Sequence, residues 1–170
     1  MRTRNARLSD AGRIHDLIAD YARQQILLPR SLAEIRKHIG DFTVVESRGE
    51  VIGCAALHRH GLDWSEIRCV AVARARQRRG VGGRLVKALL AEAEQRRVSG
   101  VCLFTCIPEY FARSGFVPVA PRSLPEKAWK DWLKCPRING RDKVAMVFAG
   151  LPAWAAPRRK SASVLGCLPE

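Results

Sequence analysis

Long hydrophobic runs are missing from this sequence of 170 residues. None approaches the roughly 18 apolar residues of a membrane-spanning helix, so we expect no membrane association. The basic segment over residues 1–8 is followed by polar helix signals, and the apolar core of a secretory signal is missing. We therefore expect a cytoplasmic protein. The hydrophobic fraction of 47% is typical of a soluble globular domain.

Metal-binding and disulfide patterns are missing as well. The six cysteines include no Cys-x-x-Cys pair, and no spacing of Cys and His supplies four zinc ligands. A disulfide scaffold is typical of short secreted chains rather than of a chain this long. We expect reduced thiols and no metal, with Cys69 and Cys106 as buried structural residues. His58 and His60, near the end of a predicted strand, are expected at the surface.

A recognisable element for reading nucleic acid is the third absence. The net charge is +14, and such a positive field attracts nucleic acid, a phosphate-rich cofactor or a dicarboxylate. Charge alone does not choose among these partners. The basic residues are spread along the chain, and neither a reading helix nor an aromatic stacking platform is evident. A basic nucleic-acid-binding module is therefore the alternative from another class, and we do not expect it.

The chain is long enough for one domain with a sizeable core. Periodic hydrophobic segments separated by turn signals indicate that this domain covers residues 1–149. Residues 150–170 break the pattern with three prolines and the basic stretch 158–160. We expect a basic, flexible C-terminal tail there.

Helix and strand signals follow one another in an order that favours a mixed α/β fold. Ser9 and Asp10 can cap a first helix, and Ser31 with Glu34 fits a capping box for a second, over about 32–39. Periodicity predicts further helices over 82–97, 108–114 and about 124–133, and strands over 42–46, 51–58, 65–72, 101–105, 116–119 and 144–148. Three consecutive strands precede a strand-helix-strand part, which indicates a mixed sheet with helices on both faces.

The most informative stretch runs from Gln77 to Gly83, between a predicted strand and a predicted helix; we name it the phosphate turn. Its glycines permit a tight bend and close approach to a ligand, and the helix start presents unpaired N–H groups and a positive dipole end. A pyrophosphate can bind there through main-chain amides, with Arg78, Arg79 and Arg84 adding positive charge. The stretch matches neither a Walker A nor a dinucleotide-binding glycine motif. A basic loop with ordinary helix-capping glycines is the alternative.

The phosphate turn and the strand before it, which ends in Ala71-Val72, resemble the acetyl-CoA signature of the GNAT superfamily. This resemblance extends over residues 1–149 by element order, and it implies a GNAT-type fold with a central, mostly antiparallel, twisted sheet. It implies acetyl-CoA as co-substrate, with its pyrophosphate on backbone amides and its pantetheine arm on main-chain groups around Val70 and Val72. The residues assigned to the cofactor are Val70, Val72, Gln77, Arg78, Arg79, Gly80, Val81, Gly82, Gly83 and Arg84.

Amine acetylation needs a neutral amine, a polarised thioester carbonyl and a proton for the leaving thiolate. Period-two alternation places Glu66, Arg68, Val70 and Val72 on one face of a strand. That strand resembles the one that carries the catalytic glutamate in histone-type GNAT enzymes and in acetylglutamate synthases, which makes Glu66 the candidate base. A solvated carboxylate, or an ion pair with Arg68, is the alternative.

The candidate acid is Tyr110. Many GNAT enzymes carry a tyrosine four residues before the glycine of a Gly-Phe pair, here Gly115-Phe116, but Phe111 stands at that position. Tyr110 lies one residue earlier. A packing role on a short helix is the alternative for this tyrosine.

Several segments resemble short, single-domain bacterial N-acetylglutamate synthases, namely residues 27–31, 51–57, 66–68, 124–125 and 144–146. This resemblance implies L-glutamate as the acetyl acceptor, in the first step of arginine biosynthesis. Two carboxylates favour two forked guanidinium clamps. We assign Arg30, Ser31 and Arg68 to the substrate, with Lys130 and Arg137 in reserve. For Arg30, a surface charge near a helix is the alternative.

Two further interpretations remain open. The acceptor can be a protein amine, such as a ribosomal-protein N-terminus or a lysine, whose site would be an open groove without convergent cations. The chain can also be a non-catalytic sensor that binds acetyl-CoA and turns over no amine. The sequence leaves the oligomeric state open, a homodimer included.

Overall fold

The computed structural model describes residues 1–133 and 143–150, and a seven-stranded sheet is the centre of this part of the chain. The strands are β1 (Arg2–Asn5), β2 (Phe42–Ser47), β3 (Glu50–His60), β4 (Trp64–Val72), β5 (Gly100–Thr105), β6 (Phe116–Pro118) and β7 (Val144–Phe148). Their spatial order is β1-β2-β3-β4-β5-β7-β6. Only β4 and β5 pair in parallel, so the predicted mixed, mostly antiparallel sheet is confirmed.

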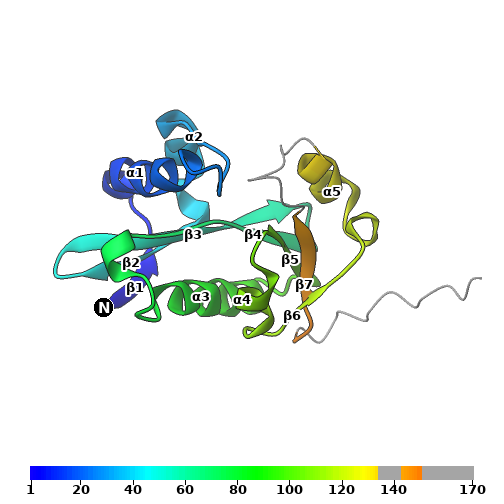
Figure 1. Ribbon diagram of the computed structural model, residues 1–170. Helices are drawn as coiled ribbons and strands as arrows, with labels where there is room; N and C mark the ends of the chain where they lie inside the picture. The colour runs from blue at the N-terminus through cyan, green and yellow to red at the C-terminus, as the bar shows by residue number, and fades with distance from the viewer. Residues whose placement is uncertain (134–142, 151–170) are drawn as a thin grey trace, which may run out of the picture.

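Helices cover both faces of the sheet, as predicted (Figure 1). They are α1 (Ala11–Ala22), α2 (Leu32–Lys37), α3 (Val81–Gln95), α4 (Pro108–Ala112) and α5 (Glu126–Leu133). Four 3₁₀ turns connect elements: η1 (Leu8–Asp10), η2 (Ile39–Asp41), η3 (Arg74–Arg76) and η4 (Pro121–Ser123). In Figure 1, α1 and α2 lie on one side of the sheet, and α3 and α4 lie on the other.

Two large apolar clusters hold these layers together. Under α3, Val81, Leu85 and Leu89 are buried against residues of β2, β3, β4, β5 and β7. On the opposite face, Ile14 of α1 and Ile35 of α2 pack on inward-facing residues of β2, β3 and β4. Burying one such side chain fully stabilises the fold by about 1.5–3 kcal/mol. The amphipathic repeat of α3 therefore locks the helix that begins at the phosphate turn onto the sheet.

The sequence patterns did not predict β1. This strand reads Arg-Thr-Arg-Asn and has no apolar alternation, yet it pairs with β2 at the edge of the sheet. Its Arg4 guanidinium reaches a carboxylate oxygen of Asp10 at 2.7 Å and one of Glu46 at 2.8 Å. Ionic contacts outside the core thus complement the backbone pairing of this strand.

The predicted helix caps had different outcomes. The capping box of α2 is confirmed, because the Ser31 hydroxyl accepts the Glu34 N–H at 3.2 Å and the Glu34 carboxylate accepts the Ser31 N–H at 2.8 Å. Asp10 stands at the N-cap position of α1, as predicted, but the Asp10 side chain does not bond to that helix. Its carboxylate points backward and accepts the Arg7 N–H at 2.7 Å, because the chain first makes the turn η1.

Three expectations concern features away from the sheet. None of the helices in residues 1–133 and 143–150 combines the length and apolarity that a membrane crossing needs. The described cysteines are unpaired, with Cys54, Cys69 and Cys102 buried but Cys106 only half-buried, so its predicted burial is wrong in degree. Of the tail predicted over 150–170, residues 151–170 lie outside the described residues, as does Cys135.

Candidate active site

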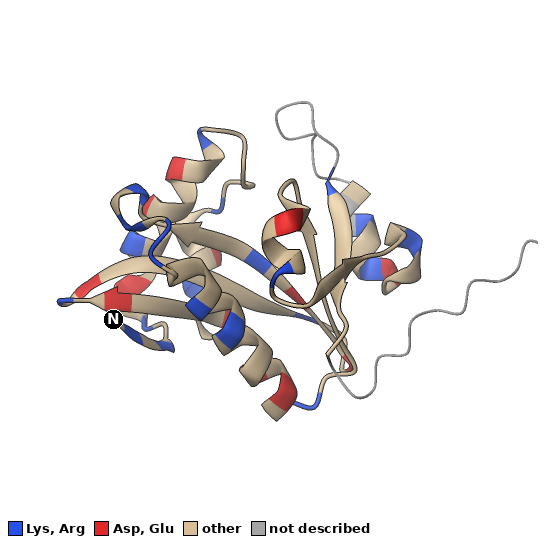
Figure 2. Cartoon of the chain, turned by 60° about the horizontal axis from the view of Figure 1, so that its bottom comes forward, with Lys and Arg blue, Asp and Glu red and all other residues tan. Residues whose placement is uncertain are grey.

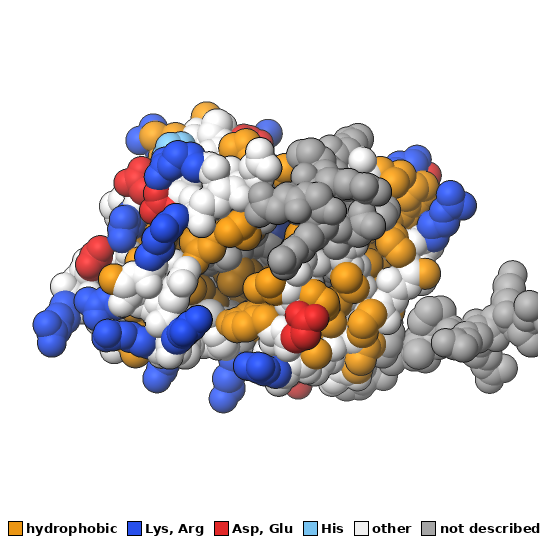
Figure 3. Space-filling model, in the orientation of Figure 1, with side chains coloured by type: hydrophobic (Ala, Val, Ile, Leu, Met, Phe, Trp, Pro, Cys, Tyr) orange, Lys and Arg blue, Asp and Glu red, His pale blue; other side chains and the backbone are white. Residues whose placement is uncertain are grey.

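A cleft of about 1150 Å³ opens where β4 and β5 separate. The two parallel strands are paired only as far as Glu66 and Cys102, and the cleft begins beside that last pair. It continues between α1 on one side and α4 on the other, down to the start of α3. Figure 3 shows hydrophobic side chains gathered about the middle of this face of the molecule.

The structure brings most of the predicted site residues together in this cleft. Its lining includes Arg30, Glu66, Arg68, Val70, Val72, Gln77, Arg78, Gly80, Val81, Gly82, Gly83 and Tyr110. Ser31, Arg79 and Arg84 are outside the lining. Ser31 is engaged in capping α2. Of the reserve cations, Lys130 forms an ion pair with Glu126 on α5, and Arg137 lies outside the described residues.

A β-bulge in β4 divides the predicted residues between the two faces of the sheet. Ala56 is opposite Arg68 and Cys54 is opposite Ala71, so two residues of β4 face one residue of β3. Cys69 sits in this bulge with φ of +56°, a conformation that is uncommon for a residue with a side chain. The prediction of one shared face for positions 66, 68, 70 and 72 is therefore wrong.

The consequence of the bulge is a change of side along the strand. Before it, Arg68 projects toward α2 and lines a small pocket there. After it, Val70 and Val72 pack with the α3 cluster, while Ala71 joins the cluster under α1. The bulge thus places charged groups on one side of the cleft and an apolar wall on the other.

Glu66, the candidate base, is buried and has one protein partner in the described part of the chain. Nε2 of His60 lies 2.7 Å from its Oε2 atom. The His60 side chain is only 1% exposed, so its predicted surface position is wrong, and His58 is also half-buried. The sequence reasoning missed His60, although its position close before Glu66 across a hairpin was a usable signal.

The phosphate turn has the backbone expected of an anion site. Gly80 precedes α3 with φ of +76° and Arg78 has φ of +58°. The first helical hydrogen bond runs from the Arg84 N–H to the Gly80 carbonyl at 3.1 Å. The N–H groups of Val81, Gly82 and Gly83 therefore have no carbonyl acceptor within α3 and remain available to a ligand.

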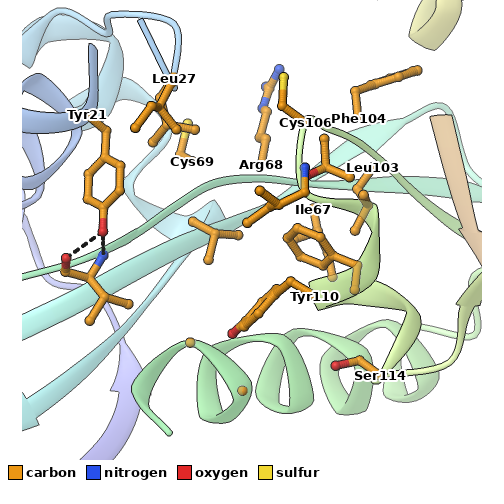
Figure 4. Close-up of a pocket in the computed structure, with 18 of the residues that line it drawn as sticks. Tyr21, Leu27, Ile67, Arg68, Cys69, Leu103, Phe104, Cys106, Tyr110 and Ser114 are labelled. Atoms are coloured by element: carbon orange, nitrogen blue, oxygen red, sulfur yellow. Dashed lines mark hydrogen bonds between the residues drawn. The ribbon is translucent and has the colours of Figure 1, made fainter. Parts of the chain in front are cut away.

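Tyr21 of α1 holds the strand end that leads into this turn. Its hydroxyl donates to the Val72 carbonyl at 2.7 Å and accepts from the side-chain amide of Gln77 at 2.7 Å. Figure 4 shows this tyrosine across the cleft from Tyr110. The carbonyl of Val72 is thus already occupied, which leaves Val70 as the freer of the two positions assigned to pantetheine.

Tyr110, the candidate acid, extends from α4 toward the start of α3 (Figure 4). A Cβ atom added at Gly82 would overlap the Tyr110 hydroxyl oxygen, so the phenol rests directly on that glycine. Burial raises the pKa of Tyr110. A tyrosine hydroxyl is protonated at neutral pH in any case, so this group can supply a proton beside the start of α3.

Arg30 lies just before the cap of α2, and Arg68 lies on β4. Both line the main cleft and a neighbouring pocket of about 80 Å³. Burial raises the pKa of the Cys69 thiol, and the two guanidiniums counteract this effect. Arg30 also lies 3.7 Å from Glu34. The two cations that the sequence assigned to an acidic substrate therefore meet beside the candidate base.

His38, Asp41 and His58 bring their ligand-type atoms within 4.8 Å of one another. His38 and Asp41 line the pocket of about 80 Å³ together with Arg30 and Arg68, and the positive charge of the two arginines opposes a bound cation. Nδ1 of His58 lies 3.3 Å from Asp41, and this contact lowers the pKa of the carboxyl. We interpret the group as an ion-paired cluster that borders the cleft.

Basic side chains occur on several elements, in agreement with the spread of charge seen in the sequence (Figure 2).

Residues 11–115 match the Acetyltransferase (GNAT) family. The chain is 36% identical to an uncharacterized N-acetyltransferase of Chlorobaculum tepidum, over 85% of this chain and 93% of that protein. It is also 36% identical to the amino-acid acetyltransferase of Neisseria meningitidis, over 85% of this chain but only 33% of that enzyme.

Solved structures agree with these relatives. The N-acetylglutamate synthase of Neisseria gonorrhoeae, complexed with coenzyme A and N-acetyl-glutamate, matches with a TM-score of 0.79 and 33% identity, over 86% of this chain and 34% of that one. A Mycobacterium tuberculosis protein in complex with CoA matches with a TM-score of 0.75 and 29% identity, over 87% and 98%. This chain thus spans about a third of the Neisseria enzymes. With the cleft, the phosphate turn and the sheet described above, these matches show that the chain belongs to the GNAT acetyltransferase family and is an acetyl-CoA-dependent N-acetyltransferase.

Proposed function

We propose that the chain acetylates the α-amine of L-glutamate by direct transfer from acetyl-CoA. The observation that carries this proposal is the convergence of Arg30 and Arg68 beside Glu66 in one cleft. An amino acid with two carboxylates needs two cationic partners, and guanidiniums suit carboxylates because they can donate two parallel hydrogen bonds. The relatives named amino-acid acetyltransferase and N-acetylglutamate synthase support the same substrate.

Each cofactor role in this proposal belongs to a described element. The first-turn N–H groups of α3 and the Arg78 guanidinium bind the pyrophosphate of acetyl-CoA. The pantetheine arm follows β4 past Val70 toward the gap between β4 and β5. This path places the thioester near Glu66, where the strands separate.

The transfer then requires three proton movements. Glu66 accepts a proton from the substrate ammonium, directly or through water, and the neutral amine attacks the thioester carbonyl carbon. The C–N bond forms, the C–S bond breaks, and the leaving thiolate takes the proton of the Tyr110 hydroxyl. The acetylated nitrogen then loses its extra proton to the Tyr110 phenolate, which yields the neutral amide and restores the phenol. The position of the phenol against Gly82, at the edge of the cleft, supports that role.

The test is a free-thiol release assay with acetyl-CoA and L-glutamate, run beside other amino acids, polyamines and peptides. We expect glutamate to be the preferred acceptor. Activity on peptides with none on glutamate would instead indicate a protein acetyltransferase. Normal acetyl-CoA binding with no turnover of any amine would indicate a non-catalytic sensor.

Variants assign the roles. Glu66→Gln should mainly lower kcat, and Arg30→Ala should mainly raise the KM for glutamate. Arg36→Ala is the matched control, because Arg36 is an exposed arginine on α2, close to Arg30 along the chain but outside the cleft lining. Parent-like kinetics of both site variants would exclude these assignments. Synthesis of N-acetylglutamate for arginine biosynthesis in the cytoplasm is the cellular role consistent with this proposal.

A further inference from the structure

His60 makes a buried contact that the proposed transfer reaction does not yet use. Nε2 of His60 lies 2.7 Å from Oε2 of Glu66, and the two side chains are 1% and 12% exposed. His60 is not part of the cleft lining, whereas Glu66 is. The histidine therefore supports the carboxylate from behind and does not reach the substrate space.

The contact has one favourable arrangement of protons. An ionised carboxylate only accepts hydrogen bonds, so Nε2 of His60 must carry the proton that joins it to Glu66. Nδ1 of His60 is buried and has no hydrogen-bond partner among residues 1–133 and 143–150. A charged imidazolium would bury an unpaired N–H there, which is costly. The neutral Nε2–H tautomer beside an ionised Glu66 is thus the arrangement that the site favours.

We propose that His60 is a positioning residue that holds one oxygen of the Glu66 carboxylate and directs the second oxygen into the cleft. Oε2 is engaged by His60, and no described residue is hydrogen-bonded to Oε1. The carboxylate stands at the last paired residue of β4 before the strand leaves β5. Fixing one oxygen there leaves the other to face the incoming ammonium. This inference rests on the proposed role of Glu66 as the base.

Other titratable and charged groups also surround Glu66, and none replaces this contact. His58 is opposite Glu66 on β3, and its ring packs edge-on against the His60 ring with centroids 5.2 Å apart. Asp41 of η2 lies beyond it at 3.3 Å. Arg68 lies two residues after Glu66 on β4. Cys102 of β5 is paired with Glu66, and burial, together with the charge of Glu66, raises the pKa of the Cys102 thiol. Only the imidazole of His60 gives Glu66 a hydrogen bond among the described residues.

The experiment compares three variants at position 60 with one control variant at position 15. His60→Met removes the donor with a side chain of related length. His60→Gln and His60→Asn are both amides, but only the glutamine nitrogen extends far enough to take the place of Nε2. His15→Met is the matched control, because His15 lies on α1 and its side chain is 40% exposed.

We expect kcat/KM to fall by about 10–100-fold in the Met and Asn variants, with parent-like values in the Gln and His15 variants. The acidic limb of the kcat/KM profile should move to higher pH in the Met and Asn variants only, since the ionised carboxylate loses its hydrogen-bond donor there. Calorimetric binding of coenzyme A should be unchanged in all four variants, which shows that the fold and the cofactor site persist.

Two outcomes separate this inference from the function on which it rests. If Glu66→Gln is inactive while His60→Asn keeps the parent activity and pH profile, His60 has no positioning role and the inference is wrong. If Glu66→Gln retains full activity, Glu66 is not the base, and the proposed mechanism fails with it. If His60→Met does not fold, the contrast between the Asn and Gln variants still decides, because the two amides differ in reach and not in polarity.

Discussion

The Tyr21 hydroxyl donates a hydrogen bond of 2.7 Å to the Val72 carbonyl and thereby ties α1 to the end of β4, beside the phosphate turn (Figure 4). The same oxygen accepts a hydrogen bond from Gln77 at 2.7 Å. One side chain from the N-terminal helix therefore organises the strand and the turn that bind acetyl-CoA in the proposed function.

Removal of this hydroxyl tests its contribution to the cofactor site. In Tyr21→Phe, Val72 and Gln77 both lose a partner, while the ring keeps its packing. We expect acetyl-CoA to lose about 1 kcal/mol of binding free energy. This corresponds to a rise of about fivefold in the KM for acetyl-CoA, with little change in kcat. Steady-state kinetics with varied acetyl-CoA measure this change. Tighter binding would mean instead that Tyr21 competes with the pantetheine arm for Val72.

Gly80 should be important for the phosphate turn, because its φ of +76° is unfavourable for a residue with a side chain. Gly80→Ala should cost about 1–2 kcal/mol and weaken coenzyme A binding in calorimetry. The control is Gly12→Ala on α1, where an added Cβ meets nothing within 4 Å and φ is not positive. That variant should melt at or above the parent temperature. Equal coenzyme A affinity in both variants would contradict the role of Gly80.

Tyr110 and Gly82 should behave as a coupled pair. Gly82→Ala places a Cβ on the phenol oxygen, so it should displace Tyr110 and lower kcat. Tyr110→Phe removes both the clash and the proposed acid, and should lower kcat by about 10-fold or more. In the double variant the alanine should cause little further loss, and a double-mutant cycle measures this coupling. Strictly additive losses would show that the two residues act independently.

The Arg4–Asp10 ion pair should stabilise the fold in a pH-dependent way. Arg4 lowers the pKa of the Asp10 carboxyl, and both side chains are largely buried. A depressed folded-state pKa contributes stability above the unfolded value of about 3.9, and this stability is lost as the pH falls through the folded-state pKa. The free energy of unfolding of Asp10→Asn should therefore be lower by about 2 kcal/mol at pH 7. This corresponds to a decrease of about 4–8 °C in Tm.

The measurement for Asp10 is thermal denaturation of the parent and the variant at several pH values. The difference in Tm should be largest near neutral pH and should shrink below about pH 4. Glu50→Gln is a suitable comparison, because Glu50 pairs with Arg13 at 3.0 Å but its side chain is 58% exposed. Exposed pairs contribute little, so its effect should be small at every pH. A difference for Asp10→Asn that does not vary with pH would refute the ionic explanation.

The sequence by itself determined the order of the helices and strands from α1 onward, the capping of α2 by Ser31 and Glu34, and the turn that begins α3. These features depend on neighbours close along the chain, such as the apolar repeat of α3 and the glycines before it, so local patterns suffice to predict them. The edge strand β1 escaped prediction because its pairing with β2 is stabilised by backbone bonds and by Arg4, not by an apolar pattern.

The tertiary structure alone decided on which side of the sheet each side chain of the site lies. The bulge at Cys69 turns Val70 and Val72 to the side opposite Arg68, and period-two reasoning cannot detect one extra residue in a ladder. The burial of His60 against Glu66 likewise depends on how β3 and β4 are paired. Local preferences fix which segments become helices and strands, but long-range pairing and packing fix which side chains meet, because those contacts join residues whose distance along the chain carries no pattern.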